Sequence, residues 1–148
     1  MKEITAAPVE EIKQKYAYVE VNEQQTIIVP VDKLLESMQG LKDEFEFDYL
    51  TNLTACDYPD ETKLEVVYNL NSIGKGYTVM VKTVISRDNP EMPSVFNVWG
   101  GANWQEREVY DLLGIVFTGH PNLKRILLDD KFDGYPLRKD YQWESGRE

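Results

Sequence analysis

The stretch that decides the fold runs from residue 63 to residue 85 and reads KLEVVYNL, NSIGKG, YTVMVKTVI. Its first and last parts, Lys63–Leu70 and Tyr77–Ile85, alternate apolar with polar side chains and are rich in Val, Ile and Tyr, a pattern typical of half-buried strands. Between them, Asn71–Gly76 supplies the glycines of a hairpin loop. The sequence therefore predicts an antiparallel hairpin as the most secure part of a sheet.

The chain before this hairpin carries further periodic segments. Val31–Leu41 places apolar residues at helical spacing after Pro30, which predicts a helix with one face to bury. The other expected elements are a brief surface helix at Val9–Tyr16, a short hairpin formed by Ala17–Val21 and Thr26–Val29, and a strand from Phe45 to Leu53 that runs towards a turn at Asp57–Asp60.

The chain after the hairpin changes character. Pro90 and Pro93 mark a break, and Ser94–Leu113 is expected to be mainly helical, with an interruption at Gly100-Gly101 and a stop at Gly114. Residues 115–148 read as an irregular tail whose Trp, Tyr, Phe and Leu suggest docking on a partner. The expected fold class is α+β: a mainly antiparallel sheet with helices on one face, in a single domain (residues 1–148) made of a core (about 1–114) and a partner-docking tail (about 115–148).

Composition excludes several classes of function. With 148 residues and a net charge of -10, the chain is one acidic domain, unsuited to neutralising the phosphates of nucleic acids or anionic membranes. Its single Cys, Cys56, and single His, His120, cannot form a zinc site or hold an iron–sulfur cluster, and Cys56 is expected to be buried. We find no secretory signal, no membrane span and no glycine-rich phosphate loop.

The segment from Glu106 to Asp111 is the best candidate for function. One interpretation is an amphipathic helix with a solvated charged side, in which Arg107 and Asp111 can pair one turn apart. An enzyme interpretation would use Glu106, Glu108 and His120 as acids and bases, but residues two apart on a helix point in different directions. His120 lies in a Gly-His-Pro turn and is expected to stabilise that turn.

The last third of the chain carries a long and specific pattern, which we call the signature: Trp104, Glu106-Arg107-Glu108, Tyr110-Asp111, Gly114-Ile115, Phe117, Gly119-His120-Pro121, Leu123 and Arg125-Ile126-Leu127. A closing motif follows, Pro136-Leu137-Arg138-Lys139-Asp140-Tyr141, where a stiff Pro, an apolar Leu, charges and a Tyr suit an interface. Together they resemble the thirty-kilodalton subunit family of respiratory complex I, whose members are also called the C subunit of NADH-quinone oxidoreductase.

The resemblance implies an accessory subunit of the peripheral arm of a proton-translocating NADH:quinone oxidoreductase, inactive in isolation. It implies no cofactor in this chain, with FMN, iron–sulfur clusters and quinone in partner subunits. The chief partner would be the large quinone-site subunit, of the forty-nine-kilodalton type, and these other subunits would hold the chain on the cytoplasmic side of the cell membrane. The structural or interface residues would be Glu106, Arg107, Glu108, Asp111, Gly114, His120, Pro121, Arg125 and Pro136, Leu137, Arg138, Lys139, Asp140 and Tyr141; none would be catalytic.

Three alternatives remain open from the sequence. The signature also suits the equivalent subunit of a membrane-bound energy-converting NiFe hydrogenase or a ferredoxin-linked complex. A free-standing acid–base hydrolase would need Glu106, Glu108 and His120 in one site. A general adaptor domain unrelated to respiration would rely on the tail alone.

Overall fold

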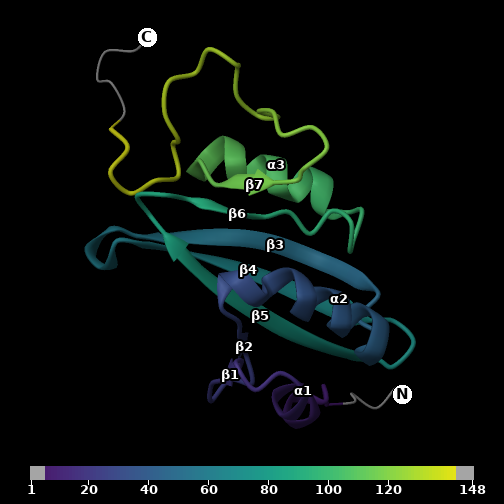
Figure 1. Cartoon of the computed structure of the whole chain (residues 1–148). Helices are drawn as coiled ribbons and strands as arrows, with labels where there is room; N and C mark the ends of the chain where they lie inside the picture. Colours follow the sequence, from purple (N-terminus) through teal and green to yellow (C-terminus); the bar gives the residue numbers. More distant parts are fainter. Residues whose placement is uncertain (1–5, 143–148) are drawn as a thin grey trace.

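A five-stranded sheet forms the body of the protein, with strand order β1-β2-β5-β4-β3, in a computed structural model that describes residues 6–142 (Figure 1). The expected tail continues to residue 148, so its last six residues lie outside this range. The strands are β1 (Glu20–Val21), β2 (Ile27–Ile28), β3 (Tyr49–Tyr58), β4 (Lys63–Ser72), β5 (Tyr77–Ser86), β6 (Glu91–Pro93) and β7 (Val116–Thr118). The helices are α1 (Val9–Lys15), α2 (Leu34–Phe45) and α3 (Ala102–Leu113), with short 3-10 turns at Val31–Lys33 and Pro59–Glu61.

The central hairpin confirms the prediction from residues 63–85. Strands β4 and β5 pair antiparallel along their whole length, from Lys63 opposite Ser86 to Ser72 opposite Tyr77. Gly76 closes the loop with a φ of 73°, a conformation that favours glycine. The predicted hairpin of β1 and β2 is also present, and β2 adds to β5 in parallel, which makes the sheet mixed but mostly antiparallel.

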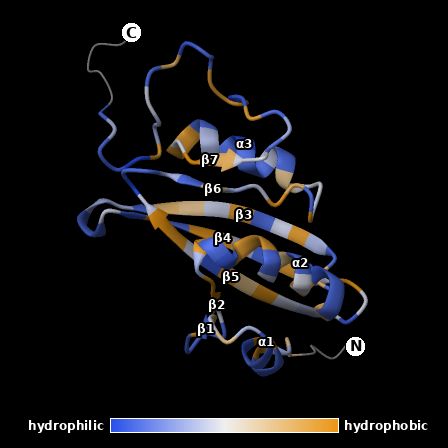
Figure 2. Ribbon diagram, in the orientation of Figure 1, coloured by the Kyte–Doolittle hydropathy of each residue, from blue (hydrophilic) through white to orange (hydrophobic). Residues whose placement is uncertain are grey.

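One face of the sheet holds the core. Alternate residues of β4 and β5 are buried, and the α2 residues Leu34, Met38 and Leu41 cover them with almost no exposure. Along α2 and α3, hydrophobic residues alternate with hydrophilic ones, as expected for helices with one buried side (Figure 2). Helix α3 packs along the edge strand β3. The predicted α+β class, with helices on one face, is confirmed.

Three local predictions are wrong. The strand expected from Phe45 to Leu53 is β3, which begins later, at Tyr49, and continues to Tyr58. It begins later because Phe45 still belongs to α2, and a left-handed Glu46 then leads into the buried Phe47. Asp57 therefore lies in a strand and not in a turn. Cys56 points from β3 to the uncovered face and is exposed.

The third error concerns residues 91–101. Helix α3 begins only at Ala102, and the segment before it consists of strand β6 and turns. β6, which Pro90 and Pro93 concealed in the sequence, pairs in parallel with β7, with Met92 opposite Phe117. The tail therefore begins with a strand and is not irregular from its start. Gly114 ends α3 as predicted, in the left-handed conformation.

Candidate functional site

Glu106 is a fully buried acid of the signature. Its carboxylate accepts hydrogen bonds from the Ser94 hydroxyl at 2.5 Å and from the Val95 backbone N–H at 2.9 Å. Burial raises the pKa of Glu106 to about 7, although these two hydrogen bonds lower it. The glutamate therefore ties α3 to Ser94 and Val95, in the turns that precede the helix.

His120 lies beside Glu106 and is held by backbone groups. Its Nδ1 accepts a hydrogen bond from the Asn122 backbone N–H at 2.9 Å, which places the ring proton on Nε2. Nε2 can then donate to the carbonyl oxygen of Asn103 at 3.1 Å, and it lies 4.0 Å from Glu106 Oε1. The predicted role of His120 in stabilising its turn is confirmed.

The hydrolase interpretation finds no support in this geometry. The Glu106 side chain is fully buried, whereas Glu108 is exposed on the other side of α3. The buried side chain of His120 is bound to backbone groups, and Pro121 beside it is exposed. The three groups that would have to act together do not share a site.

Asp111 is the anchor of the tail. One carboxylate oxygen, Oδ2, accepts hydrogen bonds from the backbone N–H groups of Ile126, Leu127 and Leu128 at 3.0, 2.6 and 3.0 Å. The other carboxylate oxygen, Oδ1, accepts a hydrogen bond from Arg125 Nη1 at 2.8 Å. Burial alone would raise the pKa of Asp111, but these donors together hold it below its ordinary value. The buried carboxylate thus ties residues 125–128 to α3.

Arg125 extends this anchor further along the tail. Its Nη1 also donates to the Asp111 carbonyl oxygen, and its Nη2 donates to the carbonyl oxygen of Gly134, both at 2.9 Å. The guanidinium lies 5.7 Å from the ring centre of Phe132 and 5.0 Å from that of Tyr135. Arg125 therefore holds two separate parts of the tail together.

Arg107 does not pair with Asp111, contrary to the amphipathic-helix interpretation. It donates to the carbonyl oxygens of Lys124 and Arg125 at 3.1 and 3.2 Å, and its guanidinium lies 4.9 Å from the ring centre of Trp104. The tail consequently covers the part of α3 that carries Arg107 and Asp111.

Gly114 accommodates an aromatic side chain of the tail. Its φ is 78°, and a Cβ at this position would lie 2.8 Å from ring atoms of Tyr135. We expect Gly114→Ala to lower the free energy of unfolding by about 2 kcal/mol, because alanine is strained in this conformation and would also displace Tyr135. Urea unfolding measures the loss. Gly74→Ala, where a Cβ meets nothing within 4 Å, is the matched control, and equal stability of both variants would contradict the prediction.

The closing motif returns to the end of α3. The Leu137 backbone N–H donates to the carbonyl oxygen of Leu112 at 2.9 Å, and Arg138 Nε donates to that of Leu113 at 2.5 Å. These carbonyls have no partner within the helix, so the motif caps it. Of its other residues, Pro136 and Tyr141 are half-buried, and the Tyr141 ring stacks on Phe132 with centroids 6.0 Å apart.

Asp57 joins the closing motif to the sheet. Arg87 donates to both of its carboxylate oxygens at 2.5 and 2.9 Å, and the Lys139 backbone N–H donates to Oδ2 at 2.8 Å. The Arg87 hydrogen bonds in particular hold the pKa of Asp57 below its ordinary value. Arg87 also pairs with Asp140 at 3.0 Å. Sequence reasoning missed Asp57 and Arg87, since they are distant from each other in the chain and both lie outside the signature.

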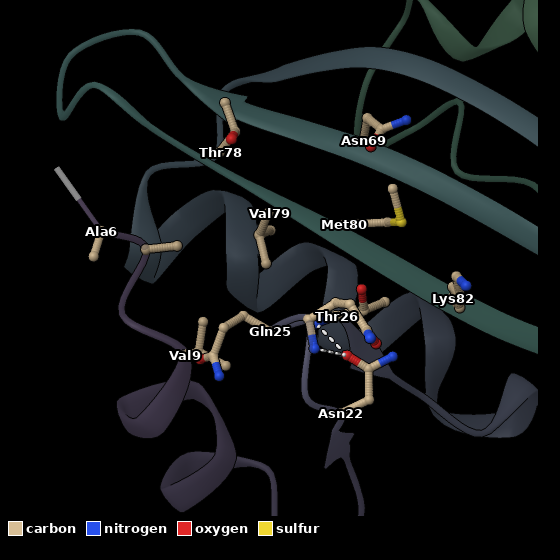
Figure 3. Close-up of a pocket in the computed structure, with 12 residues that line it drawn as sticks. Ala6, Val9, Asn22, Gln25, Thr26, Asn69, Thr78, Val79, Met80 and Lys82 are labelled. Atoms are coloured by element: carbon tan, nitrogen blue, oxygen red, sulfur yellow. Dashed lines mark hydrogen bonds between the residues drawn. The ribbon is translucent and has the colours of Figure 1, made fainter. Parts of the chain in front are cut away.

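A surface hollow lies away from all these residues. It measures about 660 Å³ and is bordered by the N-terminal segment, the β1–β2 loop and β5, with Lys82 at one end (Figure 3). At this hollow the Asn22 side-chain oxygen Oδ1 accepts a hydrogen bond from the Thr26 backbone N–H within the same loop. Within residues 6–142 no three His, Cys, Asp or Glu side chains are grouped as metal ligands, and no helix is long and apolar enough to cross a membrane.

Comparison with known proteins gives several concordant matches. The C subunit of NADH-quinone oxidoreductase from Moorella thermoacetica is 42% identical over 140 residues, which cover 93% of this chain and 95% of that protein. The C/D subunit of NADH-quinone oxidoreductase from Phocaeicola vulgatus is 45% identical over 116 residues, which cover 78% of this chain but 22% of the longer relative. A chain of the membrane-bound sulfane sulfur reductase, an archaeal respiratory membrane complex, superposes with a TM-score of 0.80 at 33% identity, covering 90% of this chain and 83% of that one.

The family match agrees with these relatives and with the resemblance seen in the sequence. Residues 27–147 match the family described as "Respiratory-chain NADH dehydrogenase, 30 Kd subunit". This range contains most of the sheet, helix α3, the signature and the closing motif. The chain therefore belongs to the 30 Kd subunit family of respiratory-chain NADH dehydrogenase.

Proposed function

We propose that this chain is an accessory, cofactor-free subunit in the peripheral arm of a proton-translocating NADH:quinone oxidoreductase. It supports the large quinone-site subunit while neighbouring subunits pass electrons from NADH to quinone. One observation supports this proposal most directly: the signature residues Glu106, Asp111 and Arg125 form hydrogen bonds with groups of their own chain. Side chains whose polar groups are already bonded within the chain stabilise the shape of its surface and are not free to act on a substrate.

Two further observations support the assignment of cofactors and partner to other chains. One Cys and one His are fewer than the four ligands that an iron–sulfur cluster usually takes. The C/D relative is one polypeptide in which a region similar to this chain is a minor part, so C and D are neighbours there. Attachment to the cytoplasmic side of the membrane would come through such partners.

A second candidate is the equivalent subunit of an energy-converting NiFe hydrogenase or a ferredoxin-linked complex. The similarity to a chain of an archaeal sulfane sulfur reductase supports considering it, because the same fold there belongs to a respiratory membrane complex that is not named for NADH or quinone. The electron donor distinguishes the two candidates.

Affinity purification from native membranes tests both. The tagged chain, extracted in mild detergent at low salt, should bring with it flavin, iron–sulfur and membrane subunits of a quinone oxidoreductase, identified by mass spectrometry. A nickel–iron hydrogenase set would favour the second candidate. Recovery of the chain alone, under conditions in which other subunits of the membrane stay assembled, would contradict both.

A further inference from the structure

The exposed side of α3 carries a stripe of apolar and acidic side chains that the rest of residues 6–142 covers only in part. Trp104, Glu108 and Leu112 stand four residues apart and so lie along one side of the helix. The Trp104 side chain is 58% exposed and Leu137, bonded to Leu112 at the helix end, is 57% exposed. Large apolar side chains exposed at both ends of one stripe are unusual for a surface that faces only water.

A groove lies between this stripe and strand β3, and we call it the α3–β3 groove. Its apolar walls come from Leu53, Val109, Leu112 and Leu137, and its volume is about 160 Å³. Ligand pockets for cofactors or metabolites usually measure about 300–1,000 Å³. The α3–β3 groove is therefore suited to one or two apolar side chains of a protein partner.

The two ends of the stripe are held in place before any partner binds. Arg107, fixed by the carbonyl oxygens of Lys124 and Arg125, lies against the Trp104 ring. Leu137 is fixed by its backbone bond to Leu112. Aromatic and apolar anchors that are already ordered lose little conformational entropy on binding and carry much of the affinity of interfaces.

The charge of the groove indicates the chemistry of its occupant. Glu108 lines the groove and is exposed, and no cation lies within ion-pairing distance of it in the described chain. A partner that covers it must bring a basic side chain, since an unpaired carboxylate is costly to desolvate. In the C/D relative, a region similar to this chain shares one polypeptide with the D part, which makes D the neighbour whose segment we assign to the groove.

We infer that the α3–β3 groove receives an apolar segment with a basic side chain from the large neighbouring subunit, the D part of the C/D relative. This inference rests on the proposed function and adds which surface makes the contact. Trp104 and Leu137 flank the inserted apolar side chains, while Glu108 pairs with the base. The buried charges of the signature and closing motif do not contact the partner; they hold the groove in shape.

The test is recovery of the large subunit with the tagged chain from native membranes. Trp104→Ala/Leu137→Ala should lower this recovery at least about tenfold, and Glu108→Lys should lower it most at low salt, where charge repulsion is least screened. The matched control is Ile73→Ala, which removes a 67% exposed apolar side chain from the β4–β5 loop and should leave recovery unchanged. Circular dichroism melting checks that each variant is folded.

Each outcome bears on one claim. Wild-type recovery by all folded variants overturns the groove inference but leaves the proposed function intact, whereas a wild-type chain that recovers no respiratory subunits overturns the proposed function itself. A photo-crosslinking residue placed at the exposed groove position Thr54 identifies the occupant. Crosslinking to a segment of the large subunit that contains Lys or Arg is expected, and crosslinking to any other subunit, or to none, overturns the assignment.

Discussion

Asp111→Ala should lower the free energy of unfolding by about 3–5 kcal/mol, the largest effect that we expect from a single substitution. The change leaves the guanidinium of Arg125 without its carboxylate in a setting where the arginine side chain is only 10% exposed. It also leaves the N–H groups of Ile126, Leu127 and Leu128 without their acceptor. Residues 125–128 should then detach from α3.

Urea unfolding at neutral pH measures the loss caused by Asp111→Ala. Asp130→Ala is the matched control, because Asp130 is an exposed aspartate of the same tail and its removal should change stability by about 0.5 kcal/mol or less. Asp111→Asn, which keeps one acceptor oxygen but no charge, should fall between the two. A loss below about 1 kcal/mol for Asp111→Ala would show that the tail is held by other contacts.

The β4–β5 hairpin was predictable from sequence because its strands are long and periodic. β4 and β5 alternate over ten residues each, and a glycine loop joins them, so local pattern and final pairing agree. β6 and β7 have three residues each, too few for a period, and helix α3 separates them in the chain. Short parallel pairs of this kind are fixed by tertiary packing, which a single sequence does not display.

The signature marked the right residues but not their contacts. Helical spacing suggested that Arg107 would pair with Asp111, yet the tail supplies the partners of both. A buried carboxylate surrounded by backbone N–H groups leaves no periodic trace, because the donors belong to irregular chain. Its only sequence sign was the placement of acids on both sides of one helix, which an ordinary amphipathic helix does not require.

Protonation of Glu106 gives the second large expected effect, a dependence of protein stability on pH. The pKa of Glu106 is about 7 in the folded protein and near 4.5 in an unfolded chain, so the folded state binds more protons between these values. Stability should therefore fall as pH rises from about 4.5 to 7 and stay level above that, with a total contribution of about 3 kcal/mol. Below about pH 4, protonation of Asp57 and Asp111, whose pKa values are lowered in the fold, acts in the opposite direction.

Glu106→Gln isolates this effect, because the amide resembles the protonated acid. Its oxygen can accept the Val95 N–H and its NH₂ group can donate to the Ser94 hydroxyl, so the variant should match the wild type near pH 5 and exceed its stability by about 2–3 kcal/mol at pH 8. Urea unfolding from pH 4.5 to 8 measures both curves. Glu108→Gln, on the exposed side of the same helix, should keep the wild-type profile. Parallel curves for Glu106→Gln and the wild type would mean that Glu106 is already ionised at pH 5, and that its hydrogen bonds outweigh its burial.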